Sequence, residues 1–316
     1  MISRTYLTRG GNLELLQGVV PEASTHLEEE GYAIVRGAFS IDDVAALTGE
    51  LQGLFDRFEP DVRLPGATAE DYADFRYEAL NRCAAAQSAV AHRAILNVIE
   101  PLLGEDCHVV SNTAWRNQPQ REKAPFDVGN PWHVDAGPHV PRPADVPWDE
   151  RIPYPVFMIG CHILLQDCGL ESGPTGFIPR SHTSGQLPPG PDGSGMISYK
   201  GRGPAVPLGQ AGDVVFFVSD VWHRRMPTGP GDEGRFFLQV QYGRRRMTYT
   251  SPDRGAGGTA GQGRLRRPLP RSVRGCSGRW NPRMNRAAKP FVVPAPCRRC
   301  DALHGAPASR RPSDVD

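Results

Sequence analysis

Residues 212–223 read GDVVFFVSDVWH. The Gly212-Asp213 pair is a turn signal, and an unbroken apolar run from Val214 to Val218 follows it. A short run of β-branched and aromatic residues bounded by turn residues indicates a buried strand. The stretch therefore predicts a turn and a buried strand that end in a Trp-His pair, with His223 as its last residue.

Similar runs, rich in Val, Ile, Phe and aromatic residues, lie on both sides of this stretch. We expect further strands over residues 107–115, 156–165, 175–178 and 235–242. They are separated by neither a Rossmann glycine fingerprint nor a phosphate-binding loop, so a parallel nucleotide-binding sheet has no support.

The first hundred residues have a largely helical pattern. Ser40 and Asp43 form a capping box at the start of a helix that we expect to reach about Phe58. Other helices are expected over residues 25–30, 69–82 and 88–103, with a strand over 32–36. Helices followed by antiparallel strands predict an α+β, mainly β fold: a jelly roll, or cupin-like double-stranded β-helix, flanked by N-terminal helices.

The chain of 316 residues changes character after Met247. Residues 248–316 hold 14 Lys and Arg against four Asp and Glu, and 17 Gly and Pro, with one short apolar stretch at residues 291–293. Such a segment buries too little apolar surface to offset the entropy of ordering it. We expect one jelly-roll domain over residues 1–247, helical over about 20–104 and β-rich over about 105–247, and a disordered basic tail over 248–316.

Composition excludes several classes of protein. The 35 Gly and 31 Pro disfavour a helical bundle, and seven Cys at irregular spacing are typical of reduced thiols. No run of 18 apolar residues exists, and none follows the N-terminal arginines, so we expect a soluble, cytoplasmic protein with no membrane partner.

The tail contains two features that could suggest other functions. Cys297 and Cys300 with His304 lack the second ligand pair that makes a zinc site convincing. Its arginines would attract polyanions weakly, but without a reader fold we expect no specific nucleic-acid partner.

Residues 131–137 read PWHVDAG and contain an H-x-D triplet. Side chains at i and i+2 of a strand share a face, so His133 and Asp135 can bind one metal ion. His223 is the candidate third ligand. Two histidines and a carboxylate on one face of an octahedron are typical of non-haem iron(II) oxygenases, which keep three positions open.

Arg235 follows His223 by twelve residues and opens the last strand run. A guanidinium beside the metal can bind one end of a dicarboxylate while the other end chelates iron, as 2-oxoglutarate requires. Residues Arg244, Arg245 and Arg246 are alternative anchors if the register differs.

The order of these motifs resembles the phytanoyl-CoA dioxygenase family of iron(II)- and 2-oxoglutarate-dependent oxygenases. The similarity covers roughly residues 25–246 and is carried by EGYAIVRG (30–37), WHxD (132–135), LxD (165–167), ESGP (171–174), IPxSH (178–182), GD (212–213), WH (222–223) and Arg235. Two residues depart from the family pattern: Arg225 replaces a frequent small hydroxyl residue, and Arg180 replaces a usual Gly.

The resemblance implies a set of roles for particular residues. Iron would be bound by His133, Asp135 and His223, and Arg235 would bind the distal carboxylate of 2-oxoglutarate. Trp115 and Asn117 would line the co-substrate pocket. With O₂ as the oxidant, the expected reaction is hydroxylation of a small or medium organic molecule with release of succinate and CO₂. The carboxylate at position 135 disfavours halogenation.

Two other functions stay open at this point. The protein could be a non-catalytic jelly-roll metabolite-binding protein that retains the metal site, or its tail could make it a nucleic-acid-associated oxygenase. Three further histidines are expected to have structural roles: His139 in a loop, His162 as a buried hydrogen-bonded residue and His182 in the turn after residue 179.

Overall fold

A computed structural model describes residues 4–7, 13–16, 21–63, 65–119, 131–190 and 197–247. Strands β1 (Arg4–Leu7) and β2 (Leu13–Leu16) form an antiparallel pair. The expected tail and its Cys297–Cys300 motif lie outside the described residues. Among the helices of the described ranges, none combines the length and the apolar character needed to cross a membrane.

A six-stranded antiparallel sheet with the order β3-β8-β6-β10-β5-β4 forms one wall of the jelly roll. Its strands are β3 (Tyr32–Val35), β4 (Phe75–Tyr77), β5 (His108–Asn117), β6 (Met158–Leu164), β8 (Val214–Val218) and β10 (Arg235–Gly243). The opposite wall is a small sheet of β7 (Thr175–Phe177) and β9 (His223–Arg225). Single backbone bridges from His133 to His223 and from Phe177 to Ala205 extend it, which confirms the expected jelly roll.

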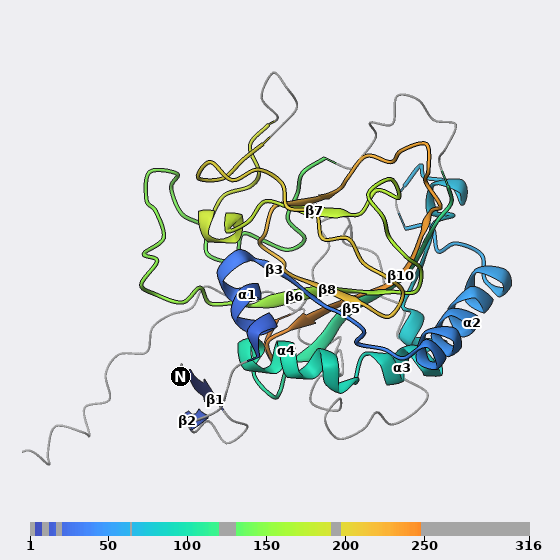
Figure 1. The fold of residues 1–316 in the computed structure, drawn as a ribbon, viewed down its shortest axis with the longest axis horizontal. Coiled ribbons are helices and arrows are strands. Elements are labelled where there is room, and N and C mark those ends of the chain that lie inside the picture. Colours follow the sequence, from blue (N-terminus) through green and yellow to red (C-terminus); the bar gives the residue numbers. More distant parts are fainter. Residues whose placement is uncertain are drawn as a thin grey trace, which may run out of the picture. The chain divides into compact units, whose positions relative to one another are not determined.

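Helices cover one face of the large sheet. They are α1 (Glu22–Glu30), α2 (Ile41–Arg57), α3 (Ala84–Ala89) and α4 (Arg93–Leu103), with 3₁₀ turns at Glu70–Tyr72, Ala79–Asn81 and Ser181–Ser184. Figure 1 shows α1, α3 and α4 on one side of the sheet and β7 on the other. The expected capping box begins α2: Ser40 Oγ accepts from Asp43 N, and Asp43 Oδ2 accepts from Ser40 N.

The alternation of side chains along β10 explains how the two faces differ. Phe236, Leu238, Val240 and Tyr242 pack into the apolar core between sheet and helices. The alternate residues of the strand point to the opposite face because successive strand residues alternate; they are Arg235, Phe237, Gln239 and Gln241. Polar groups therefore line the interior between the two sheets.

The helix expected over residues 69–82 is wrong. Two short 3₁₀ turns and strand β4 occupy this range. Phe75 and Tyr77 alternate as strand residues do, and they pair with Trp115 and Thr113 of β5. Pairing of aromatic residues with the edge of the large sheet has outweighed helix propensity here.

The helix expected over residues 88–103 is two helices, α3 and α4, with a break after Ala89. His92 is extended at the start of α4, and its ring Nδ1 accepts from Ala94 N at 3.4 Å. A side-chain acceptor at this position satisfies a backbone N–H that the first helical turn leaves unpaired.

Candidate metal centre and anion site

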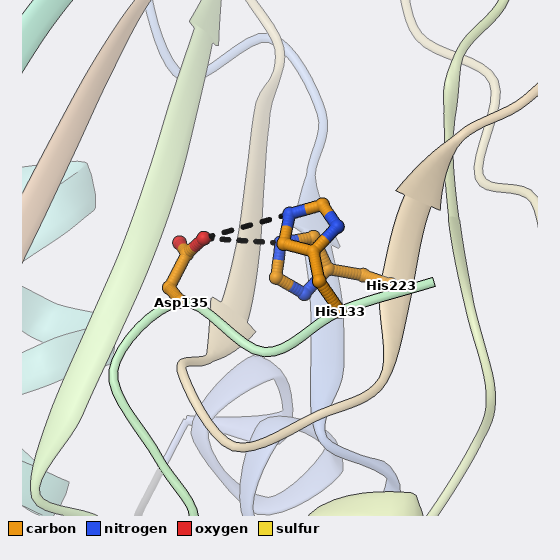
Figure 2. A group of neighbouring side chains, drawn as sticks. All are labelled: His133, Asp135 and His223. Carbon is orange, nitrogen blue, oxygen red and sulfur yellow. Dashed lines mark ion pairs between the residues drawn. The ribbon is translucent and has the colours of Figure 1, made fainter. Parts of the chain in front are cut away.

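His133, Asp135 and His223 meet in the interior between the sheets (Figure 2), and one ligand atom of each lies within 4.8 Å of the others. Asp135 Oδ1 lies 3.8 Å from His133 Nε2 and 3.3 Å from His223 Nε2. Among the described residues, these three side chains form a group of histidine and acidic residues with the spacing of metal ligands. The structure thus brings together the three residues that the sequence predicts as metal ligands.

Backbone hydrogen bonds place the two histidines side by side. His133 N donates to His223 O and His223 N donates to His133 O, both at 3.0 Å. Each ring is oriented by its own neighbour: His133 Nδ1 donates to Pro131 O and His223 Nδ1 to Val221 O, both at 2.9 Å. Since Nδ1 carries the proton, Nε2 of each ring is left to bind a metal.

The third ligand is oriented by a residue that the sequence did not reveal as functional. Gln241 Nε2 of β10 donates to Asp135 Oδ2, so that Oδ1 faces the two imidazoles. Gln241 is buried, and its Oε1 has no hydrogen-bond partner. The alternation of polar and apolar residues along this strand was the available signal.

Charge interactions within the centre are strong. Burial alone would lower the pKa of His223, but the Asp135 carboxylate outweighs burial and raises that pKa. Burial and then the neighbouring His223 lower the pKa of His133. Burial would raise the pKa of Asp135, yet His223 and its hydrogen bond lower it. The triad therefore favours an ionised carboxylate beside nitrogen ligands, which is a donor set for a divalent cation.

A second polar group in the interior surrounds Arg235, the first residue of β10. Arg235 Nε and Nη2 donate to Asn117 Oδ1 at 3.2 and 3.0 Å, and Asn117 Nδ2 donates to Asp74 Oδ2 at 2.9 Å. Burial and then the adjacent Arg225 lower the pKa of Arg235 to about 9, so the guanidinium is still charged at neutral pH. These hydrogen bonds fix one edge of the guanidinium and do not use Nη1.

His162 is close enough to both Arg235 and the metal centre to interact with their charges. A cavity is lined by His162, Leu164, Gln166, Cys168, Pro174, Thr175, Pro207, Val215, Arg235, Phe236 and Phe237. Burial, and then the charge of Arg235, lower the pKa of His162 to about 3, so the imidazole is neutral. His162 is buried as expected, but it also borders this cavity, which the sequence did not indicate.

Arg225, one of the two residues that depart from the expected family pattern, places a second guanidinium near Arg235. It is paired with Thr175 across the small sheet, and its Nε and Nη2 are buried without a hydrogen-bond partner. Burial lowers the pKa of Arg225, and the charges of Asp232 and Asp74 offset only part of this effect. The interior at this end therefore carries two cations.

The remaining predicted residues have varied surroundings. Trp115 faces the interior, stacks on Phe237 and donates from Nε1 to Gln239 Oε1 at 2.8 Å. His182 is buried and its Nε2 donates to Glu28 O at 2.9 Å, in keeping with the expected turn role. Arg244 donates to Val156 O and Leu102 O, away from Arg235, so it is not an anchor in this register.

Comparison with known families agrees with this geometry. The family model described as phytanoyl-CoA dioxygenase (PhyH) matches residues 27–226. The chain belongs to the phytanoyl-CoA dioxygenase family. The range matched by the phytanoyl-CoA dioxygenase model includes His133, Asp135 and His223, whereas Arg235 and Gln241 lie beyond it. No curated protein matches the sequence.

Solved structures share the fold at low identity. One is the epimerase SnoN in complex with Fe³⁺, α-ketoglutarate and nogalamycin RO: 18% identity, TM-score 0.51, covering 71% of this chain and 82% of that chain. Another is the non-haem α-ketoglutarate-dependent carbocyclase SnoK from nogalamycin biosynthesis: 18% identity, TM-score 0.51, covering 72% of this chain and 85% of that chain. At this level of identity the likeness establishes the jelly-roll fold.

Proposed function

We propose that the protein is an iron(II)- and 2-oxoglutarate-dependent dioxygenase that hydroxylates a small or medium organic substrate and releases succinate and CO₂. The observation that carries the proposal is the convergence of His133 Nε2, His223 Nε2 and Asp135 Oδ1 within 4.8 Å of one another. The membership in the phytanoyl-CoA dioxygenase family supports it.

The donor set fits iron(II). It consists of two imidazole nitrogens, freed by Nδ1 hydrogen bonds to backbone carbonyls, and one carboxylate oxygen. Three ligands on one face leave positions for other molecules, as non-haem iron oxygenases require, whereas structural zinc sites are closed by four protein ligands. Iron(II) bound here would supply O₂ activation, with 2-oxoglutarate oxidised to succinate and CO₂.

Arg235 is suited to bind the distal carboxylate of 2-oxoglutarate. Its guanidinium is buried, held at one edge by Asn117 and exposed to the cavity that also contacts His162. A charge-assisted hydrogen bond in such a site is stronger than one in water. The neutral imidazole of His162 adds a polar group to the cavity beside Arg235 without adding charge.

Aromatic side chains cover His223, the buried histidine of the centre. The ring of His223 lies 4.8 Å from that of Phe217 and 6.1 Å from that of Phe177, measured between centroids. Phe237 covers His162 at 4.6 Å. Excluding water strengthens the electrostatic interactions inside the site and limits side reactions.

Hydroxylation is favoured because the third ligand is a carboxylate. Asp135 occupies the position that a halide would need, so a halogenating reaction has no place for its halide. Neighbours with the same fold include an epimerase and a carbocyclase, so the product must be identified and not only the consumption of co-substrate.

The decisive experiment measures succinate. Protein purified anaerobically and loaded with iron(II) should convert 2-oxoglutarate to succinate when O₂ is admitted, slowly alone and faster with a substrate from a metabolite extract. Mass spectrometry should then detect a product heavier by one oxygen atom. Iron binding without succinate under any substrate would contradict the proposal.

A further inference from the structure

A buried carboxylate outside the ligand set, Asp220, lies in the turn between β8 and His223. It is 2% exposed. Its Oδ2 accepts from His139 N at 2.9 Å and from Tyr154 Oη at 2.6 Å, while its Oδ1 accepts from His139 Nδ1 and from Ser219 Oγ at 3.2 Å. Burial would raise the pKa of Asp220, but the hydrogen bonds from His139 and Tyr154 outweigh it and lower that pKa. The carboxylate is therefore ionised at neutral pH.

Three of these hydrogen bonds come from the two ends of one loop. This loop, residues 136–157, starts directly after the ligand Asp135 and ends at β6. His139 lies near its beginning and Tyr154 near its end, so a single carboxylate holds both ends together. The chain also passes close to Asp220 at Gly137, where an added Cβ would lie 2.7 Å from Asp220 Oδ1.

A backbone hydrogen bond joins the turn that contains Asp220 to the metal centre. Asp135 N donates to Ser219 O at 3.1 Å, and Ser219 is the neighbour of Asp220. Beyond the turn, His223 is held by its paired backbone bonds to His133. Asp220 therefore connects two segments by hydrogen bonds: the loop that follows Asp135 and the turn that precedes His223.

We propose that Asp220, together with His139, positions Asp135 and His223 for metal binding. This inference rests on the proposed function, because it assumes that the triad binds iron(II). Asp220 acts through the backbone of its neighbours, so it is a positioning residue. The hydrogen bond to Asp220 also fixes His139 with its proton on Nδ1.

Asp213 provides a matched control at the other end of β8. It is also a buried carboxylate, 4% exposed, and accepts from Arg36 Nη1, Gly37 N and Gln210 N, each at 2.8 Å. None of these partners belongs to the metal centre. Loss of charge at Asp213 should therefore lower stability without changing metal affinity.

The test compares Asp220→Asn, Asp220→Ala and Asp213→Asn in the full-length protein. Binding of iron(II) alone is measured anaerobically by calorimetry, and the melting temperature is measured with a chelator present. Asp220→Asn should weaken iron binding about tenfold, as substitutions around metal ligands do, and Asp220→Ala should weaken it further. Asp213→Asn should lower the melting temperature and leave the iron affinity unchanged.

Two further measurements keep the test conclusive. Nitrogen-15 NMR of the metal-free protein should show His139 protonated on Nδ1, and Asp220→Ala, which removes the acceptor, should shift the tautomer populations. If Asp220→Ala does not fold, Tyr154→Phe removes one hydrogen bond and should give a smaller loss of affinity. Iron affinity equal to wild type in Asp220→Asn and Tyr154→Phe would overturn the inference, whereas a wild-type protein that binds no iron(II) would overturn the proposed function itself.

Discussion

The two sheets of the jelly roll differ in length and in what they carry. In the large sheet, β10 is bonded along its length to β5 on one side and β6 on the other. The small sheet has strands of only three residues, β7 and β9, extended by single bridges. Yet His133 and His223 belong to this small sheet. The large sheet thus forms the scaffold. Two of the three candidate metal ligands are held in the small sheet by only a few backbone hydrogen bonds.

The largest effect should come from the small sheet. His223→Ala removes a nitrogen ligand and should abolish iron(II) binding and succinate formation, because a two-ligand site lacks the facial geometry. His223 takes no part in the backbone ladders of the large sheet, so the circular dichroism spectrum should stay that of the wild type. Calorimetry with iron(II) measures the first outcome, and measurable tight binding by the variant would contradict it.

A smaller effect is expected from Arg235 on the large sheet. Arg235→Ala would remove the charged hydrogen bonds that we propose to the co-substrate, at about 3 kcal/mol, so 2-oxoglutarate affinity should fall roughly 100-fold. Iron affinity should remain. Arg235→Lys keeps the charge and should recover part of the loss. Titration of iron-loaded protein with 2-oxoglutarate measures this, and equal affinity for Arg235→Ala and wild type would place the carboxylate elsewhere.

Gln241 connects the two regions, because it lies on β10 and bonds to Asp135. Gln241→Leu removes the amide that orients the carboxylate and should weaken iron binding about tenfold. Gln239→Leu, two residues earlier on the same face, loses only its bond with Trp115 and serves as the control. A loss of iron affinity of similar size in both variants would mean that the interior as a whole, and not the bond to Asp135, was disturbed.

The smallest effect on the site should come from overpacking the large sheet. An added Cβ at Gly160 of β6 would lie 2.3 Å from Phe217 Cζ. Gly160→Ala should lower the free energy of unfolding by about 1–3 kcal/mol. Phe217 also lies beside the ring of His223, so the folded fraction should bind iron(II) only slightly more weakly than the wild type. Urea unfolding and calorimetry test the two parts, and an unchanged unfolding midpoint would show that Phe217 moves aside without cost.

Local patterns in the sequence predicted much of this fold. Apolar runs located the long strands, and the capping box located the start of α2. The range of β4 was predicted as a helix because local sequence does not show which strand it pairs with. Its aromatic residues form a strand only beside β5, and β5 comes later in the chain. Strand β9 was not predicted as a strand, since three residues after a turn carry too little pattern.

Site residues that belong to sequence motifs could be predicted. Site residues whose position depends on the pairing register of the strands could not. The H-x-D triplet and His223 supply the residue types that a two-histidine, one-carboxylate metal site needs. The structure brings their ligand atoms together. Gln241 and His162 enter the interior only because β10 and β6 pair in a particular register, with Gln239 opposite His162. Asp220 resembles any acidic residue in a turn until its partners, 66 and 81 residues away, are known.

The late position of β10 in the chain has a consequence for synthesis. Strands β5 and β6 are made first, but they are neighbours of β10 and not of each other. While the ribosome is still translating residues before Arg235, both nascent strands have an unpaired edge and the interior lacks Arg235 and Gln241. Such edges are prone to intermolecular pairing. A frameshift or stop before this strand should therefore yield aggregates rather than a weakened enzyme.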